Sequence, residues 1–113
     1  MINDLTDWIA EVIQAPAPVL VWFTADWCGY CRQLRPVLEE LAEGGHVVLR
    51  VDADRHRGLT REHRVRGLPT VLIYKQGEET ARIVGAEPKS LYLDALREPL
   101  TRASVIREKE GGQ

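Results

Sequence analysis

Cys28 and Cys31 are the only two cysteines of this 113-residue chain, and they lie two residues apart in the segment Trp27-Cys28-Gly29-Tyr30-Cys31. The apolar run 19–24 precedes this segment, and residues 32–43 after it have helical spacing. A strand that leads straight into a helix places the first sulfur at the helix N-terminus, where unpaired backbone N–H groups and the helix dipole favour a thiolate. The pattern predicts a redox-active dithiol.

The two cysteines have different expected roles. With two intervening residues they can form a disulfide across one helical turn or relay a mixed disulfide. We expect Cys28, at the helix start and more exposed, to be the attacking thiolate, and Cys31, one turn further in, to be the resolving thiol. The rate of attack depends on both the thiolate fraction and the nucleophilicity of the sulfur, so a thiol with a pKa near the ambient pH is the best nucleophile.

Two other readings of a close cysteine pair stay open at this point. The pair could be half of a zinc site completed by histidines, for which His46, His56 and His63 are available. Their spacing is unfavourable, since His56 and His63 are six residues apart instead of the usual three to five. The pair could also be inert and buried.

Size and composition narrow the class of protein. The length suits one domain, and 44% apolar residues can supply its core. A net charge of −2 gives no general attraction to nucleic acid or anionic lipid. No apolar stretch approaches the roughly 20 residues needed to span a bilayer. The acidic start, Met1 to Asp7, lacks the features of a signal peptide, which favours a cytoplasmic location.

Periodicity predicts the elements that position the cysteines. The first helix buries Leu5, Trp8 and Val12, is capped by Asn3 or Asp4, and ends at Ala15-Pro16-Ala17-Pro18. The remaining elements are expected as a strand at 19–24, a helix to Glu43, a strand at 47–51, a short helix near 59–63, a strand at 70–74, a turn at Gln76-Gly77, a strand near 80–84 and a helix from Pro88.

This order predicts an α/β fold. We expect a central, mostly parallel sheet of about four strands with an antiparallel edge hairpin, and helices on both faces. The domain should comprise residues 1–100, and residues 101–113 should form a charged tail that is frayed or serves in packing or dimer contacts.

Several motifs together resemble the thioredoxin family, over roughly residues 5–97. They occur in that family's order and spacing, and the combination is far more specific than two cysteines alone. The motifs are Trp27-Cys28-Gly29-x-Cys31 after a buried strand, Pro36 five residues further on, Gly67-Leu68-Pro69-Thr70 ahead of a strand, Lys75-Gln76-Gly77-Glu78, and Val84-Gly85-Ala86.

The resemblance implies a thioredoxin-like fold and site. Cys28 would be the nucleophile and Cys31 the resolving cysteine. Leu68-Pro69 would be a cis peptide bond that turns the backbone of Leu68 toward an extended substrate strand. A shallow apolar substrate groove would be formed by Trp27, Gly29, Tyr30, Leu68, Pro69 and Gly85, with Val84 and Ala86 flanking the last of these.

The implied activity is reduction of protein disulfides by thiol–disulfide exchange. A reductase flavoprotein resembling thioredoxin reductase, or a low-molecular-weight thiol, would restore the dithiol, and no bound cofactor or metal is needed. Nucleic acid and membrane are not expected partners. Two alternatives stay open, a disulfide oxidase or isomerase in an oxidising compartment and a redox-inactive peptide-binding module.

Three departures from the family pattern bear on function. Gly29-Tyr30 stands between the cysteines where thioredoxins usually have Gly-Pro, which is expected to make the pair less reducing. Trp22 replaces the usual buried aspartate, and we expect slower resolution by Cys31 because the proton acceptor is lost; Trp22 could instead stack with Arg50. The family's first strand is nearly missing, with Ile2 as a stub.

An arginine-rich segment lies between the cysteines and Pro69. Its arginines are Arg50, Arg55, Arg57, Arg61, Arg64 and Arg66. They form either a solvated basic face or, near Arg66, a rim that attracts acidic partners and favours the Cys28 thiolate.

Overall fold

A computed structural model of the chain describes residues 1–98, which form a five-stranded sheet with helices on both faces. The order across the sheet is β1-β3-β2-β4-β5. The strands are β1 (Asn3–Asp4), β2 (Val19–Thr24), β3 (Val47–Asp52), β4 (Thr70–Lys75) and β5 (Glu78–Val84).

β2 is the centre of the sheet and carries the site at its end. All six of its residues are buried, as expected for an apolar run covered on both faces. It pairs in parallel with β3 on one side and antiparallel with β4 on the other. The residues just beyond Thr24 therefore leave the sheet from its most constrained strand.

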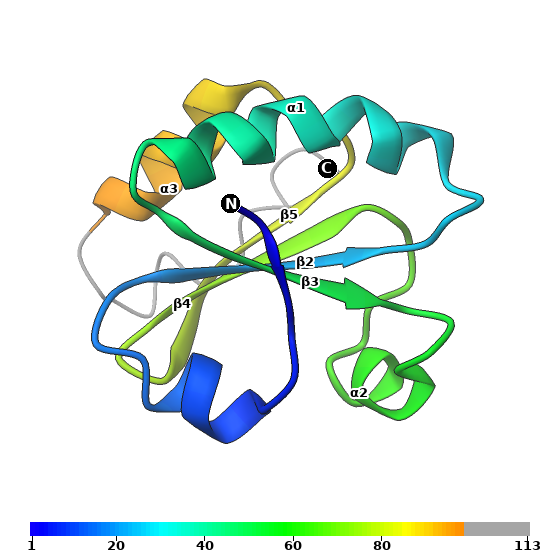
Figure 1. Cartoon of the computed structure of the whole chain (residues 1–113), viewed down its shortest axis with the longest axis horizontal. Coiled ribbons are helices and arrows are strands. Elements are labelled where there is room, and N and C mark those ends of the chain that lie inside the picture. The colour runs from blue at the N-terminus through cyan, green and yellow to red at the C-terminus, as the bar shows by residue number, and fades with distance from the viewer. Residues whose placement is uncertain (99–113) are drawn as a thin grey trace.

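Four helical segments cover the two faces (Figure 1). Helices α1 (Gly29–Glu43) and α3 (Lys89–Arg97) lie over one face. The short π-helical segment η1 (Ile9–Ile13) and α2 (Arg57–Glu62) lie over the other. Each face has its own apolar core, one including Leu34, Leu38 and Tyr92, the other Val12, Phe23 and Leu72.

The expected fold class is confirmed, with two differences in the sheet. It has five strands because Asn3 and Asp4 pair in parallel with Leu49 and Arg50 of β3, so the stub is a two-residue strand. The sheet is also not mostly parallel: β1–β3 and β2–β3 pair in parallel, whereas β2–β4 and β4–β5 pair antiparallel. The reason is that the chain runs in the opposite direction when it returns from α2 to form β4.

The predicted first helix was wrong in its start and cap. The Leu5 N–H donates to the Arg50 carbonyl and so continues the β1 ladder. The Glu11 carboxylate accepts hydrogen bonds from the N–H groups of Asp7 and Thr6, and these bonds lower the pKa of Glu11. The Asp7 carboxylate accepts a hydrogen bond from the Ala10 N–H. Helical geometry therefore begins after Asp7.

The hairpin between β4 and β5 was predicted correctly. Gln76 and Gly77 both have positive φ, 53° and 80°, the conformation that a tight two-residue turn needs. A Cβ at position 77 would lie 3.0 Å from the Ile13 carbonyl oxygen, so the glycine also lets η1 approach closely. The predictions for the tail at 101–113 lie outside the described residues.

Candidate functional site

The loop after β2 brings Cys28 to the start of α1, where the two cysteines form a disulfide. Their Cα atoms are 5.2 Å apart. Cys28 is the N-cap of α1, with extended backbone, and its Sγ accepts a 3.1 Å hydrogen bond from the Cys31 N–H. This places the first sulfur among the donors of a helix N-terminus, as the sequence predicted.

Both cysteines are largely buried in this oxidised form. Cys28 is 5% exposed and Cys31 2%. The order of exposure agrees with the prediction, although the difference is small. Trp27 and Tyr30, which adjoin the cysteines in the chain, are 68% and 65% exposed, so two open aromatic rings flank a buried disulfide in the sequence.

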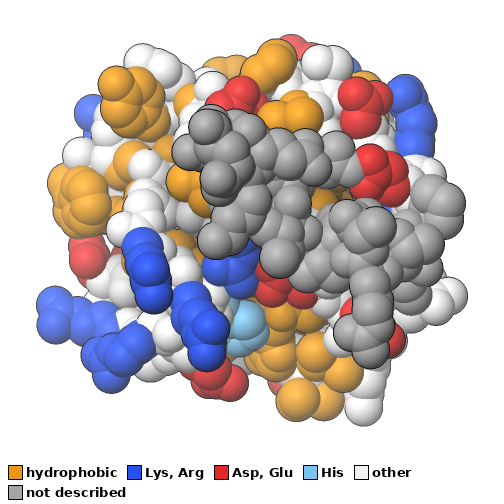
Figure 2. Space-filling model, turned by 180° about the vertical axis from the view of Figure 1, so that it is seen from behind, with side chains coloured by type: hydrophobic (Ala, Val, Ile, Leu, Met, Phe, Trp, Pro, Cys, Tyr) orange, Lys and Arg blue, Asp and Glu red, His pale blue; other side chains and the backbone are white. Residues whose placement is uncertain are grey.

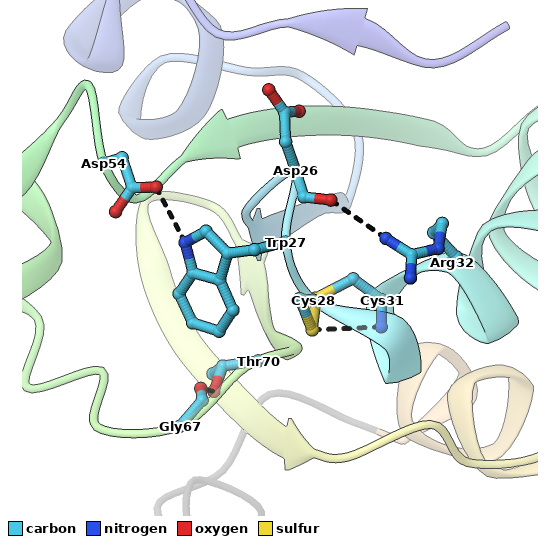
Figure 3. The surroundings of a disulfide bond; sticks show 8 residues. All are labelled: Asp26, Trp27, Cys28, Cys31, Arg32, Asp54, Gly67 and Thr70. Carbon is cyan, nitrogen blue, oxygen red and sulfur yellow. Dashed lines mark hydrogen bonds between the residues drawn. A yellow bond between two sulfur atoms is a disulfide. The ribbon is translucent and has the colours of Figure 1, made fainter.

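The predicted cis peptide bond between Leu68 and Pro69 is present. The hydroxyl of Thr70 donates a 2.6 Å hydrogen bond to the Gly67 carbonyl, which closes the turn around the bond (Figure 3). The Gly85 N–H donates to the Pro69 carbonyl at 2.9 Å, so Gly85 lies directly beside Pro69. Leu68 packs against the core cluster that contains both cysteines.

Trp27 is held on the other side of the loop by a residue from the end of β3. Its indole Nε1 donates a 2.9 Å hydrogen bond to Oδ2 of Asp54. Figure 3 shows the ring between Asp54 and the turn that contains Gly67 and Thr70. Although the ring is exposed, this bond fixes its orientation relative to the cysteines.

Apolar and basic surfaces lie near each other on this part of the molecule. The exposed large apolar residues here include Trp27, Tyr30 and Val84. Figure 2 shows Lys and Arg side chains gathered at the corner where α2 lies. Arg66, the predicted basic neighbour of the groove, is exposed immediately before Gly67.

Trp22 packs in the same core cluster as both cysteines, but its cationic neighbour is not the Arg50 that one of the expectations named. Trp22 is in register with Arg50 of β3. The guanidinium over its ring is nevertheless that of Arg35, with Cζ 5.4 Å from the ring centroid. The Arg50 Nε donates a 2.8 Å hydrogen bond to Asp4, and this bond raises the pKa of Arg50. The stacking of Trp22 with Arg50 is therefore not the arrangement found.

A cavity of about 160 Å³ opens next to Cys31 on the α1 side of the sheet. It is lined by Trp22, Thr24, Ala25, Asp26, Cys31, Arg32, Arg35 and Arg50. Asp26 is exposed, and its backbone carbonyl accepts a 2.9 Å hydrogen bond from Arg32 (Figure 3).

The described residues also bear on the other classes of site. Across residues 1–98, His, Cys, Asp and Glu side chains form no group of three or more that could hold a metal ion. His63 instead contacts Trp8, with ring centroids 4.5 Å apart. Within the same range, no helix is long and apolar enough to cross a membrane.

Sequence reasoning missed Asp54, Arg32 and Arg35 as parts of the site. Asp54 had a usable signal, since parallel β2 and β3 end at the same edge of the sheet and Asp54 follows β3 closely. The two arginines had none beyond their place in the first turns of α1, because helical spacing does not say how a helix crosses a sheet.

Comparisons with known proteins agree with this geometry. The thioredoxin family model matches residues 2–98. The chain is 37% identical to the M-type chloroplastic thioredoxin of Spinacia oleracea over 88% of its length, and spans 56% of that protein. It is 34% identical to the thioredoxin of Rickettsia felis, over 83% of this chain and 94% of that one.

A solved structure gives the same result for the fold. A mutant thioredoxin from Halobacterium salinarum superposes with a TM-score of 0.76 at 29% identity, covering 88% of this chain and 90% of the other. The region matched by the family model contains the cysteine pair, the cis-proline turn and the whole described sheet. The chain therefore belongs to the thioredoxin family.

Proposed function

We propose that this chain reduces disulfide bonds of protein substrates, with Cys28 as the nucleophile and Cys31 as the resolving cysteine. The observation that carries the proposal is the position of Cys28 as the N-cap of α1, with its sulfur accepting the Cys31 N–H at 3.1 Å. In the reduced protein the same donor and the helix dipole stabilise a thiolate on Cys28 and leave Cys31 as a thiol.

The reaction is two successive thiol–disulfide exchanges. The Cys28 thiolate attacks one sulfur of the substrate disulfide, forms a mixed disulfide and releases the first substrate sulfur as a thiolate. Cys31 then loses its proton and attacks the Cys28 sulfur, which forms the Cys28–Cys31 disulfide and releases the second substrate thiolate. Two electrons pass from the dithiol to the substrate.

The substrate-binding residues proposed are Trp27, Gly29, Tyr30, Leu68, Pro69 and Gly85. The exposed rings of Trp27 and Tyr30 offer apolar contact beside Cys28. The cis bond before Pro69 presents the Leu68 backbone for strand-like pairing. Gly85, hydrogen-bonded to Pro69, allows the substrate backbone to approach.

Regeneration requires an electron donor, which we propose to be a flavoprotein resembling thioredoxin reductase or a low-molecular-weight thiol, in the cytoplasm. The oxidised pair accepts two electrons and two protons to return to the dithiol, and no bound cofactor takes part. The exposed arginines of the α2 region, Arg66 among them, are proposed to favour partners with acidic surfaces.

The proposal is tested by insulin reduction with dithiothreitol as electron donor. The unaltered chain should accelerate precipitation of the insulin B chain, and Cys28→Ser should abolish the acceleration. Cys31→Ser should hold substrates as a covalent adduct on Cys28, and the double variant should capture none.

Other outcomes would identify the alternatives. A peptide-binding module without redox activity would give no turnover, and Cys31→Ser would leave its peptide binding unchanged. In an oxidase or isomerase, glutathione would reduce the cysteine pair readily. The reduction potential of the pair would then lie well above that of the cytosolic glutathione pool. Either result would overturn the assignment as a reductase.

A further inference from the structure

The cavity beside Cys31 has an unusual lining for a space under an active site. Three arginines from two elements border it, Arg32 and Arg35 of α1 and Arg50 of β3, against one carboxylate, that of Asp26. The lining residues themselves carry three positive charges against one negative, while Glu39 and Asp4 pair with Arg35 and Arg50 from outside the lining. It also includes Cys31, so the cavity borders the residue proposed as the resolving cysteine.

The arginines keep donors that their present partners do not occupy. Arg32 donates one Nη1 hydrogen bond to the Asp26 carbonyl, and Arg35 makes a long ion pair of 3.9 Å with Glu39. The Arg50 Nε is bound by Asp4 at 2.8 Å. A guanidinium has five N–H donors, so each side chain can donate to a further acceptor.

An independent observation concerns Trp22, which also lines the cavity. Its Nε1 is buried and has no hydrogen-bond partner among the described residues. A buried N–H without an acceptor costs about 1–3 kcal/mol, and such groups are usually satisfied by an ordered water or an ion. Because Trp22 lines the cavity, we infer that the acceptor of this N–H lies there.

We propose that this cavity is a binding site for a small free oxyanion of the carboxylate class. Arg35 and Arg32 would supply charge-assisted hydrogen bonds, and the Trp22 indole would supply a neutral one. A volume of about 160 Å³ is large enough. One water occupies about 30 Å³ of liquid, so a carboxylate with a few heavy atoms fits in the space of several waters.

The site has a consequence for catalysis, which rests on the proposed function. The carboxylate stands next to Cys31 and takes the proton of its thiol. The resulting thiolate attacks the Cys28 sulfur, the bond from Cys28 to the substrate sulfur breaks, and the released substrate thiolate is protonated by the carboxylic acid or water. A bound anion thus takes the place of the carboxylate that Trp22 replaces.

Binding is tested on the oxidised protein, so the result does not depend on turnover. Sodium acetate is titrated against sodium chloride at constant pH and ionic strength, and the Trp22 indole N–H is followed by ¹H–¹⁵N NMR, with Trp22→Phe identifying its signal. We expect a saturable shift with a midpoint on the order of 10 mM, which is modest for four heavy atoms. Arg35→Gln should weaken binding at least about fivefold.

The matched control is Arg57→Gln, on exposed α2, which should leave the midpoint unchanged. A shift that stays linear in acetate, or a midpoint indifferent to Arg35→Gln, would overturn the proposal. The cavity would then hold water alone, and the reductase assignment would be unaffected.

The catalytic role is tested by single-turnover release of a peptide from its mixed disulfide with Cys28. Acetate should accelerate peptide release about tenfold, with the same midpoint as acetate binding. Arg35→Gln should remove the saturable part of this acceleration. Acceleration that is only linear in acetate would be ordinary solution catalysis and would overturn the role of the site in proton transfer.

Discussion

The guanidinium carbon of Arg35 lies 5.4 Å from the centre of the Trp22 ring, so a side chain of α1 covers the buried tryptophan of the central strand. Arg35 is half-exposed and Trp22 is buried. The helix that Cys28 caps is thus attached to the central strand by a cation–π contact as well as by its apolar face.

This contact should be measurable as a coupling free energy. In a double-mutant cycle of Arg35→Met and Trp22→Leu, urea unfolding should give a coupling of about 0.5–1 kcal/mol, because the guanidinium is partly solvated. Trp22→Leu alone should cost about 2–4 kcal/mol through lost packing. Additive effects, within about 0.3 kcal/mol, would mean that the two side chains merely lie close together.

The bond from Trp27 to Asp54 should matter more for substrate than for stability. Asp54→Ala frees the indole, and we expect kcat/KM for a protein disulfide to fall about three- to tenfold because the groove loses a positioned ring. The free energy of unfolding should change by less than about 1 kcal/mol, since both side chains are exposed.

Asp54→Asn is the matched control for that substitution, since it keeps an acceptor oxygen without the charge. It should recover most of the lost kcat/KM. If Asn behaves like Ala, the charge of Asp54 and not its hydrogen bond to Trp27 is the relevant property.

Gly85 should resist substitution for a reason beyond substrate access. Its φ is +99°, which side chains rarely adopt, so Gly85→Ala should destabilise the fold by about 1–2 kcal/mol and lower activity. Gly58→Ala is the comparison, because its Cβ would meet no atom within 4 Å and it lies in α2.

Alanine at position 58 should stabilise by about 0.5–1 kcal/mol. Thermal unfolding of the two variants should therefore move in opposite directions. Equal and small shifts would contradict the assigned backbone strain at Gly85.

Two buried tyrosines should make the protein sensitive to alkali. Burial raises the pKa of Tyr92 to about 12 and, together with Glu79, that of Tyr74 to about 12. Ionisation is thus easier in the unfolded chain, where the tyrosine pKa is about 10. Stability is complete below about pH 10 and is lost as the pH rises toward about 12, by about 2–3 kcal/mol for each tyrosine.

Tyr92→Phe separates this effect from a general one. The Tyr92 hydroxyl donates to the Gly85 carbonyl at 3.3 Å, so the variant should cost about 0.5–1.5 kcal/mol at neutral pH. Its denaturant midpoint should then decline less steeply as the pH rises from about 10 to about 12. An unchanged decline would show that Tyr92 does not titrate in unfolding.

The parts of the site that sequence reasoning found are those with a local signal. Cys28 and Cys31 sit between a strand pattern and a helix pattern, so their placement needs only neighbouring residues. The Gln76-Gly77 turn is of the same kind, because positive φ at two consecutive residues is a requirement that sequence displays. The cis bond before Pro69 was predicted because its four-residue motif resembles that of the thioredoxin family.

The parts it missed depend on contacts between distant elements. Arg50 was considered as a stacking partner of Trp22, and β2 and β3 do place the two residues in register. Its guanidinium turns to Asp4 instead, and Arg35 reaches the ring from α1. A strand of two residues such as β1 has no periodicity to detect, so neither Asp4 nor its ion pair could be anticipated.

The ion pair between Asp4 and Arg50 gives the beginning of the chain an influence on the redox centre. β1 contributes little to the sheet by its length, yet its second residue pairs with one of the three arginines that line the cavity beside Cys31. Loss or displacement of Asp4 makes the electrostatic environment of Cys31 more positive, and a more positive environment favours a thiolate on Cys31. The outermost strand thereby adjusts the electrostatics of a centre that lies at the end of β2, beyond the intervening β3.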